Sequence, residues 1–229
     1  MDAMKSLGMI FTSPEGAARI VTEKPRWVLP LVVFIIAIVV SGYGSFRYKA
    51  EFQKEIAARI VEDTGIQVDL DMTIDDTPWI RLRSGLLEAA GSAVFILLVP
   101  AALFNGIASI AGGAIGFKRM FTYMCHVGLI VAAGNIIRIP LMVLKQSYDV
   151  RLGAAAFLPH LDPISPLGVF LGSLDLFSIW AVVALVMGYR VLSGMGIKKA
   201  AVIVVGLWLL AILVLVGFAY LRSQVTGRA

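Results

Sequence analysis

The sequence predicts an all-α fold: a polytopic membrane helical bundle with five transmembrane helices, an N-terminal interfacial helix and one polar extramembrane loop. The chain is 59% hydrophobic, with a mean hydropathy of +0.88, whereas a soluble domain of 229 residues needs a largely polar surface. Five apolar runs come close to or exceed the roughly 20 residues that a helix needs to cross a bilayer. Charged residues lie between these runs and form no single basic stripe, which argues against a nucleic-acid partner.

The five predicted spans are bounded by charged residues, glycine or proline, and cover 27–44, 86–116, 121–144, 167–189 and 200–221. The second run is too long for one perpendicular crossing, because at 1.5 Å per residue it would measure about 45 Å. It contains Pro100, which removes a helical hydrogen bond, and Asn105. We therefore expect a strong tilt, a kink near Pro100 or a break near Asn105.

Residues 1–26 are predicted to form an interfacial amphipathic segment, separate from a five-helix membrane domain at 27–229. Ser13 is suited to cap a helix, Pro14 to its first position and Glu15 to the positive end of its dipole. Pro25 ends this helix, and Trp27 is placed like an anchor at the membrane interface. The helix either steers the chain into the first span or recruits a partner.

The loop at 45–85 is the one sizeable polar region. It begins with a helical pattern, since Phe52, Ile56 and Ile60 repeat every four residues and Gly65 is a plausible cap. The period then changes to the alternation of a strand, which is carried by Ile66, Val68, Leu70, Met72 and Ile74. Because no second strand of similar quality exists, this segment would join a partner's sheet, pair with a second copy of the chain or lie extended over the bundle.

Charge in the connecting segments predicts the orientation. Basic residues favour cytoplasmic loops. In a five-helix topology three basic segments share one side of the membrane: the N-terminal segment, Lys118–Arg119, and Arg190 with Lys198–Lys199. The 45–85 loop on the other side is net acidic between positions 51 and 76. We therefore expect the N-terminus inside and the C-terminus outside.

Polar residues inside membrane spans are costly and often functional. Arg138 and Asp175 should lie at a similar depth on consecutive antiparallel helices, and Asn135 shares a helix face with Arg138. Two interpretations remain open for this candidate intramembrane polar cluster. Its members Arg138, Asp175, Asn135 and Glu88 line a polar cavity for an ion or a lipid headgroup, or Arg138 and Asp175 form a structural clip.

The second span carries Ala108, Gly112 and Gly116 at a spacing of four, a candidate helix-packing face within the monomer or in a homo-oligomer. No catalytic or nucleotide-binding motif is present, so we expect no enzyme activity and no cofactor. Cys125 is the only cysteine, and His126 has no second ligand at a suitable spacing, so no metal site is predicted.

The sequence resembles bacterial members of the YIP family, whose eukaryotic relatives interact with Rab-type GTPases. The resemblance is carried by residues 11–15 (FTSPE) with 24–27 (KPRW), 116–123 (GFKRMFTY), and 174–180 (LDLFSIW) with Gly188 and 198–200 (KKA). It implies five membrane helices, a cytoplasmic N-terminus, an outward C-terminus and no enzyme activity. A bacterial cytoplasmic (inner) membrane is the expected location. The short N-terminal segment prevents the GTPase-binding role from being carried over, and the 45–85 loop has no match in the family.

These observations lead to two hypotheses of function. The first is a non-enzymatic scaffold, or a protein of membrane organisation or trafficking, that contacts the bilayer and a protein partner or second copy through the N-terminal helix and the 45–85 loop. The alternative is a small transporter or lipid-handling protein whose polar path contains Arg138, Asp175, Asn135 and Glu88.

Overall fold

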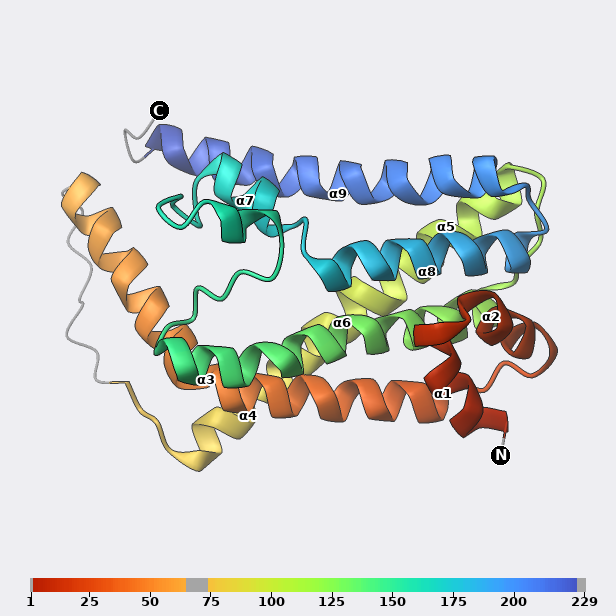
Figure 1. Cartoon of the computed structure of the whole chain (residues 1–229), viewed down its shortest axis with the longest axis horizontal. Coiled ribbons are helices and arrows are strands. Elements are labelled where there is room, and N and C mark those ends of the chain that lie inside the picture. Colours follow the sequence, from red (N-terminus) through yellow and green to blue (C-terminus); the bar gives the residue numbers. More distant parts are fainter. Residues whose placement is uncertain (1, 65–73, 226–229) are drawn as a thin grey trace.

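The computed structural model describes residues 2–64 and 74–225, and every regular element in these ranges is a helix (Figure 1). In chain order the elements are α1 (Asp2–Thr12), α2 (Pro14–Glu23), α3 (Val28–Thr64), α4 (Pro78–Ser92), η1 (Ala93–Leu98), α5 (Val99–Ile110), α6 (Phe117–Lys145), η2 (Ala154–Phe157), α7 (Pro166–Gly172), α8 (Leu176–Ser193) and α9 (Ile197–Val225).

Five helical runs in the described residues are long and apolar enough to cross a membrane, which confirms the predicted number. They are Val28–Arg59, Pro78–Ile110, Phe117–Lys145, Leu176–Ser193 and Ile197–Gln224. Because five is odd, the chain starts and finishes at opposite ends of the bundle (Figure 1). We call the end with α1 and α2 the N-terminal end, and the end with residues 146–165 the loop end.

The first membrane-spanning helix, α3, continues well beyond residue 44, the predicted end of its span. α3 runs without interruption from Val28 to Thr64, so the helical pattern at Phe52 and Ile56 belongs to this same helix. The ion pairs Arg47–Glu51 and Glu55–Arg59 stabilise the extension at a spacing of four residues. The predicted cap Gly65 and the strand positions Ile66 to Met72 lie outside the described residues, while Ile74 lies in an irregular segment before α4.

The second span is one helical run with a wide turn in its middle. In the π-helical segment η1, the Val99 N–H donates to the Val94 carbonyl five residues earlier. The wide turn lies immediately before Pro100, which has no N–H to continue the ladder. The structure thus has a π-helical turn where the sequence predicted a kink, and the helix continues through Asn105 without a break. The run ends at Ile110, and the predicted continuation to residue 116 is therefore wrong.

The fourth predicted span is divided into two helices. The short helix α7 ends at Gly172, and the spanning helix α8 begins only at Leu176. Between them, Asp175 makes an antiparallel bridge with Gly153 of the preceding loop. The bridge draws the backbone out of helical geometry, so α8 crosses the membrane with 18 residues.

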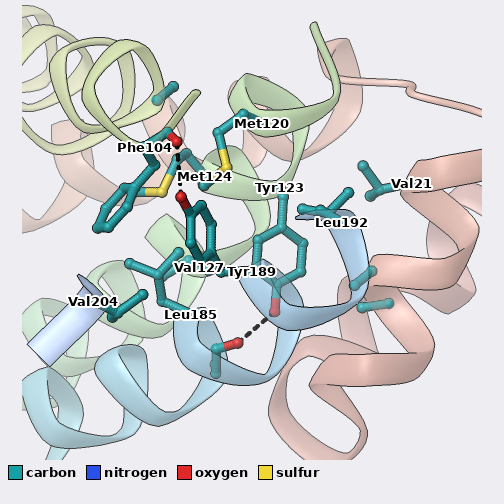
Figure 2. Close-up of a cluster of buried hydrophobic side chains, with 14 of the residues drawn as sticks. Val21, Phe104, Met120, Tyr123, Met124, Val127, Leu185, Tyr189, Leu192 and Val204 are labelled. Carbon is teal, nitrogen blue, oxygen red and sulfur yellow. Dashed lines mark hydrogen bonds between the residues drawn. The ribbon is translucent and has the colours of Figure 1, made fainter. Parts of the chain in front are cut away.

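The largest buried cluster joins α5, α6 and α8 to the N-terminal helices (Figure 2). The Tyr123 hydroxyl of α6 donates to the Ala184 carbonyl of α8 at 2.6 Å, and the Tyr189 hydroxyl of α8 donates to the Phe104 carbonyl of α5 at 3.1 Å. Gly188 makes room for the Tyr123 ring: a Cβ at this position would lie 1.9 Å from the ring's Cζ atom. Hydroxyl groups inside a bilayer need such partners because lipid offers none.

The N-terminal segment packs onto this cluster. α2 buries one face against α6 and α8, with Pro14, Ala17, Ala18 and Val21 all buried. The outer face of α2 is tied to α8 by the Glu15–Arg190 ion pair at 2.9 Å. Residue Ser13 occupies the predicted cap position, although its side chain makes no capping hydrogen bond. The apolar side of this helix is therefore used within the chain.

A second close contact joins the first two spans. A Cβ on Gly42 of α3 would lie 2.8 Å from the Cα of Gly85 in α4, and a Cβ on Gly85 would lie 2.6 Å from the Val39 carbonyl oxygen. Only glycine permits this approach of the two backbones. Beyond it, Phe34 and Ile38 of α3 pack with Leu97 and Leu129 in a separate buried cluster.

Replacing Gly188 with alanine is expected to destabilise the bundle by about 1–3 kcal/mol, because the new methyl group must displace the Tyr123 ring. The melting temperature of the purified protein in detergent measures the effect. Gly206→Ala in α9 is the matched control, since nothing lies within 4 Å of a Cβ there. A Gly188→Ala protein as stable as the Gly206→Ala protein would contradict this packing.

Candidate functional site

Arg138 and Asp175 meet at the loop end of the bundle. The Nη2 atom of Arg138, on α6, lies 3.5 Å from the Oδ2 atom of Asp175. The sequence placed Asp175 inside a helix, but in the structure it caps the N-terminus of α8. The similar depth of the two side chains follows from antiparallel helices, whereas the cap follows from the break after α7.

The carboxylate of Asp175 is occupied by its own helix. Its Oδ1 atom accepts the backbone N–H groups of Phe177 at 2.9 Å and Ser178 at 3.2 Å, and its Oδ2 atom accepts the Ser178 hydroxyl. Only 10% of this side chain is exposed. The negative charge of Asp175 is therefore stabilised by the positive end of the helix dipole as well as by Arg138.

Arg138 is less completely satisfied than Asp175. Its Nε atom is buried and has no hydrogen-bond partner, and its one ion pair is long. The side chain, 29% exposed, lines a pocket of about 330 Å³ between α6, the extension of α3 and the loop segments around α7. Phe52, Tyr148, Val169 and Gly172 are among the other residues that line this pocket. The site thus offers guanidinium N–H donors to an acceptor that enters from the loop end.

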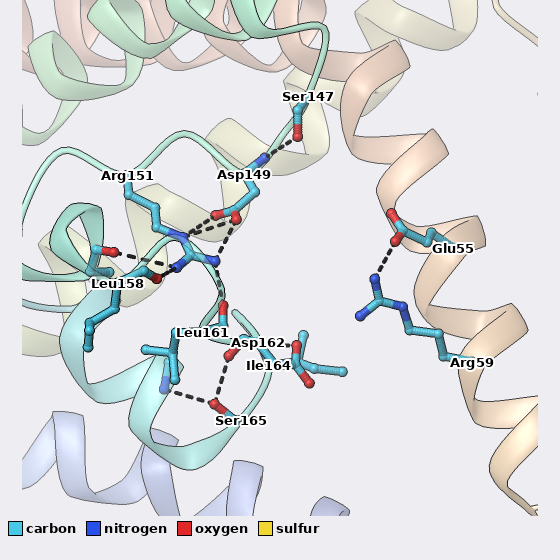
Figure 3. Close-up of polar contacts among 12 residues, drawn as sticks. Glu55, Arg59, Ser147, Asp149, Arg151, Leu158, Leu161, Asp162, Ile164 and Ser165 are labelled. Atoms are coloured by element: carbon cyan, nitrogen blue, oxygen red, sulfur yellow. Dashed lines mark hydrogen bonds and ion pairs between the residues drawn. The ribbon is translucent and has the colours of Figure 1, made fainter.

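Arg151 holds the loop wall of this pocket in place (Figure 3). Its guanidinium forms a two-pronged contact with Asp149, with Nη2 to Oδ2 at 2.6 Å, and donates to the carbonyls of Leu158 at 2.7 Å and Leu161 at 2.6 Å. The hydrogen bond to Asp149 raises the pKa of Arg151 above its ordinary value, so the residue stays charged. Because its donors serve the loop, Arg151 has a structural role.

A ring contact fixes the opposite wall. Phe52 on the extension of α3 and Tyr148 after α6 have centroids 5.5 Å apart. The sequence pattern placed Phe52 on a helical face but gave no indication of its partner. Arg151 was also missed, and the only local signal was the opposite charge of Asp149 two residues before it.

The other members of the predicted polar cluster do not join Arg138. Glu88 pairs with Lys49 at 3.0 Å between α4 and α3, and both side chains are about one-third exposed. Asn135 lies half-buried one turn before Arg138 and is not part of the pocket wall. The cluster is therefore reduced to the pair Arg138–Asp175.

Two further polar residues lie in the spans but away from this pair. The ring of His126 contacts the Thr122 carbonyl at 2.8 Å and the Ser6 hydroxyl at 3.1 Å, which ties α6 to α1. The side-chain oxygen of Asn105 is buried without a partner in α5. Within residues 2–64 and 74–225, no group of three or more His, Cys, Asp or Glu side chains could hold a metal ion.

The predicted helix-packing face is not a face of one helix. Ala108 is buried in α5, but Gly112 and Gly116 have φ angles of +87° and +82° in the turn after that helix. A spacing of four residues places side chains on one face only within a helix, and this helix ends at Ile110. Both glycines serve the reversal of the chain, since a positive φ is unfavourable for other residues.

These features define a polytopic helical membrane protein whose loop end carries an arginine-lined pocket. The family model described as the Yip1 domain matches residues 7–218, and the chain belongs to the YIP family. The match includes α2 to α8 in full, the second half of α1 and most of α9. Comparison with curated proteins and with solved structures gave no match.

Removing the acidic partner alone is expected to cost more stability than removing both partners. Asp175→Ala leaves the Arg138 charge without compensation, whereas Arg138→Ala with Asp175→Ala removes both charges, and both proteins lose the helix cap equally. The double variant should be the more stable by about 1–2 kcal/mol, as measured by thermal unfolding in detergent. Equal losses would show that the ion pair contributes nothing beyond the cap.

Replacing Arg151 with glutamine should loosen the segment between α6 and α7, because two carbonyls and Asp149 lose their donor. Proteinase K should then cleave near Tyr148 or Leu158 severalfold faster than in the parent protein, as followed by mass spectrometry of the fragments. Arg83→Gln, which removes an exposed arginine from α4, is the control and should leave the cleavage rate unchanged.

Proposed function

We propose that this chain is a non-enzymatic scaffold or organiser of the membrane, as its family membership suggests. The observation that carries the proposal is that most polar groups in the spans have separate partners within the chain. Asp175 caps a helix, Glu88 pairs with Lys49, His126 joins α6 to α1, and the buried tyrosines serve backbone carbonyls. In the described residues these groups form no continuous path that an ion or solute would need.

The contact surface of this scaffold is the extension of α3, residues 50–64. It bends away from the line of the first span at the loop end and runs obliquely beside the loop that contains α7 (Figure 1). Its charged side chains Glu51, Lys54 and Glu55 are exposed, while Phe52 and Ile56 leave part of their surface open. The N-terminal helix is the weaker candidate because its apolar face is buried against α6 and α8. The extension therefore suits a protein partner or a second copy of the chain.

The charge distribution supports an N-terminus inside and a C-terminus outside, in a bacterial inner membrane. Arg190 reaches Glu15 of α2, and the Lys199 ammonium donates to the Ala111 carbonyl. These contacts bring the basic turns together with α1 and α2 at the N-terminal end. Basic segments favour the cytoplasmic side of a bilayer.

A second function, the handling of an anionic lipid headgroup, is favoured by one observation. Arg138 borders the pocket at the loop end with a buried Nε that has no partner. An arginine at membrane depth ordinarily has its donors satisfied. Under this alternative the pocket is a terminal binding site and not part of a channel.

Accessibility to a membrane-impermeant thiol reagent separates a scaffold from a transporter. In a Cys125→Ser background, single cysteines replace Glu55 on the extension, Val169 in the pocket, and Asn135 and Asn105 in the spans. We expect labelling of the first two from outside and none of the two asparagine positions from either side. Leu213→Cys on α9 is the lipid-facing control. Labelling of Asn105 or Asn135 from the inside would establish a water path and favour transport.

The scaffold proposal also requires a partner at the extension of α3. A photo-crosslinking amino acid at Glu55 should give a discrete adduct heavier by the mass of a protein, either another chain or a second copy. The same amino acid at Leu213, which is exposed on α9, should give lipid adducts alone. Absence of any protein adduct at Glu55, Lys54 and Ala58 would argue against this surface.

A further inference from the structure

An apolar groove opens on the side of the bundle at the N-terminal end, where α3 and α6 begin. It has a volume of about 480 Å³ and is lined by Pro25, Arg26, Trp27, Val28, Leu29, Val32 and Lys118. The floor consists of the first turns of α3, whose side chains Val28, Leu29 and Val32 are 36–56% exposed. None of the roles described for the loop end involves this groove.

The charge of the groove is entirely positive. Arg26 and Lys118 stand at its rim, both exposed, and no acidic residue lines it. Neither cation has an ion pair in the part of the chain that the structure describes. At this same end Arg190 has Glu15 as its partner, and Lys199 has the Ala111 carbonyl. Arg26 and Lys118 are thus left to a ligand.

The groove lies at the depth of lipid headgroups. Val28 and Phe117 are the first residues of two spanning helices, so Arg26 and Lys118 flank the start of the apolar region. The Trp27 ring packs against Phe121 with centroids 6.0 Å apart, and Phe117 stacks on Phe121 at 5.9 Å. An aromatic group of this kind is typical of the membrane–water interface.

We propose that this groove binds one anionic phospholipid. The phosphate lies between Arg26 and Lys118, and an acyl chain follows Val28, Leu29 and Val32 into the bilayer. A zwitterionic lipid fits the apolar floor equally well but brings a cation toward two cations, which removes the electrostatic gain. This inference is independent of the proposed scaffold role and of which side of the membrane the N-terminal end faces.

Trp27 provides a reporter inside the groove. The full chain with Trp79, Trp180 and Trp208 replaced by phenylalanine keeps Trp27 as its single tryptophan, and is reconstituted in phosphatidylcholine bilayers. Brominated phosphatidylglycerol or brominated phosphatidylcholine is then added in increasing mole fraction. We expect phosphatidylglycerol to quench Trp27 with a roughly tenfold higher relative association constant, since each cation near anionic lipid contributes severalfold.

Two charge-matched variants test whether the site or the overall charge causes this preference. Arg26→Gln with Lys118→Gln should abolish the selectivity at Trp27. Arg19→Gln with Lys198→Gln removes the same charge from exposed positions outside the groove and should preserve it. A chain with Trp208 of α9 as the only tryptophan should show no headgroup preference.

Three results would overturn the proposal. They are no preference at Trp27, an equal loss of preference in both charge variants, or an equal preference at Trp27 and Trp208. The second would mean that only the general surface charge attracts the lipid. The third would mean that the lipid surrounds the bundle without a site.

Discussion

The contact between Tyr123 and the backbone of α8 holds together parts of the chain that are far apart in sequence. The Tyr123 hydroxyl bonds to Ala184 in α8 and lies 3.5 Å from the Pro14 carbonyl in α2. Its ring occupies the space that Gly188 leaves free. A buried hydroxyl in lipid must find an acceptor within the protein, so the positions of α2, α6 and α8 are fixed relative to one another. Buried residues of α5 and α9, such as Phe104 and Val204, belong to the same cluster.

The helix faces that pack against other helices differ from the faces exposed to lipid by their small residues and not by their hydrophobicity. α9 exposes leucines such as Leu209, Leu210 and Leu213, and a bilayer solvates them as readily as a protein core. Where helices meet closely, the contact residues are glycines, as at Gly42 and Gly85. Association inside a membrane gains little from burying apolar surface, so close van der Waals contact and satisfied polar groups decide which helices pair.

The two ends of the bundle have different characters. At the N-terminal end, α1 and α2 cover the helix ends, and exposed cations surround an apolar groove. At the loop end, polar contacts shape a pocket. Arg151 binds the carbonyls of the loop, and Asp175 caps the N-terminus of α8. Arg138 also lines this pocket, and unlike Arg151 it has a buried Nε atom without a hydrogen-bond partner. Its environment, not its sequence position, distinguishes it from Arg151.

The sequence by itself determined the number of spans, the all-helical class and the family. Apolar runs of spanning length have few alternatives in a bilayer, because backbone groups in lipid must bond within their own helix. The meeting of Arg138 and Asp175 was also foreseeable, since consecutive spans run antiparallel. The tertiary structure decided the break before Asp175, the end of α5 at Ile110, and the pairing of Glu88 with Lys49. These depend on bonds between segments distant in sequence, such as the bridge from Gly153 to Asp175. Hydropathy and helical period report only how each segment meets its solvent, so they carry no information about such partners.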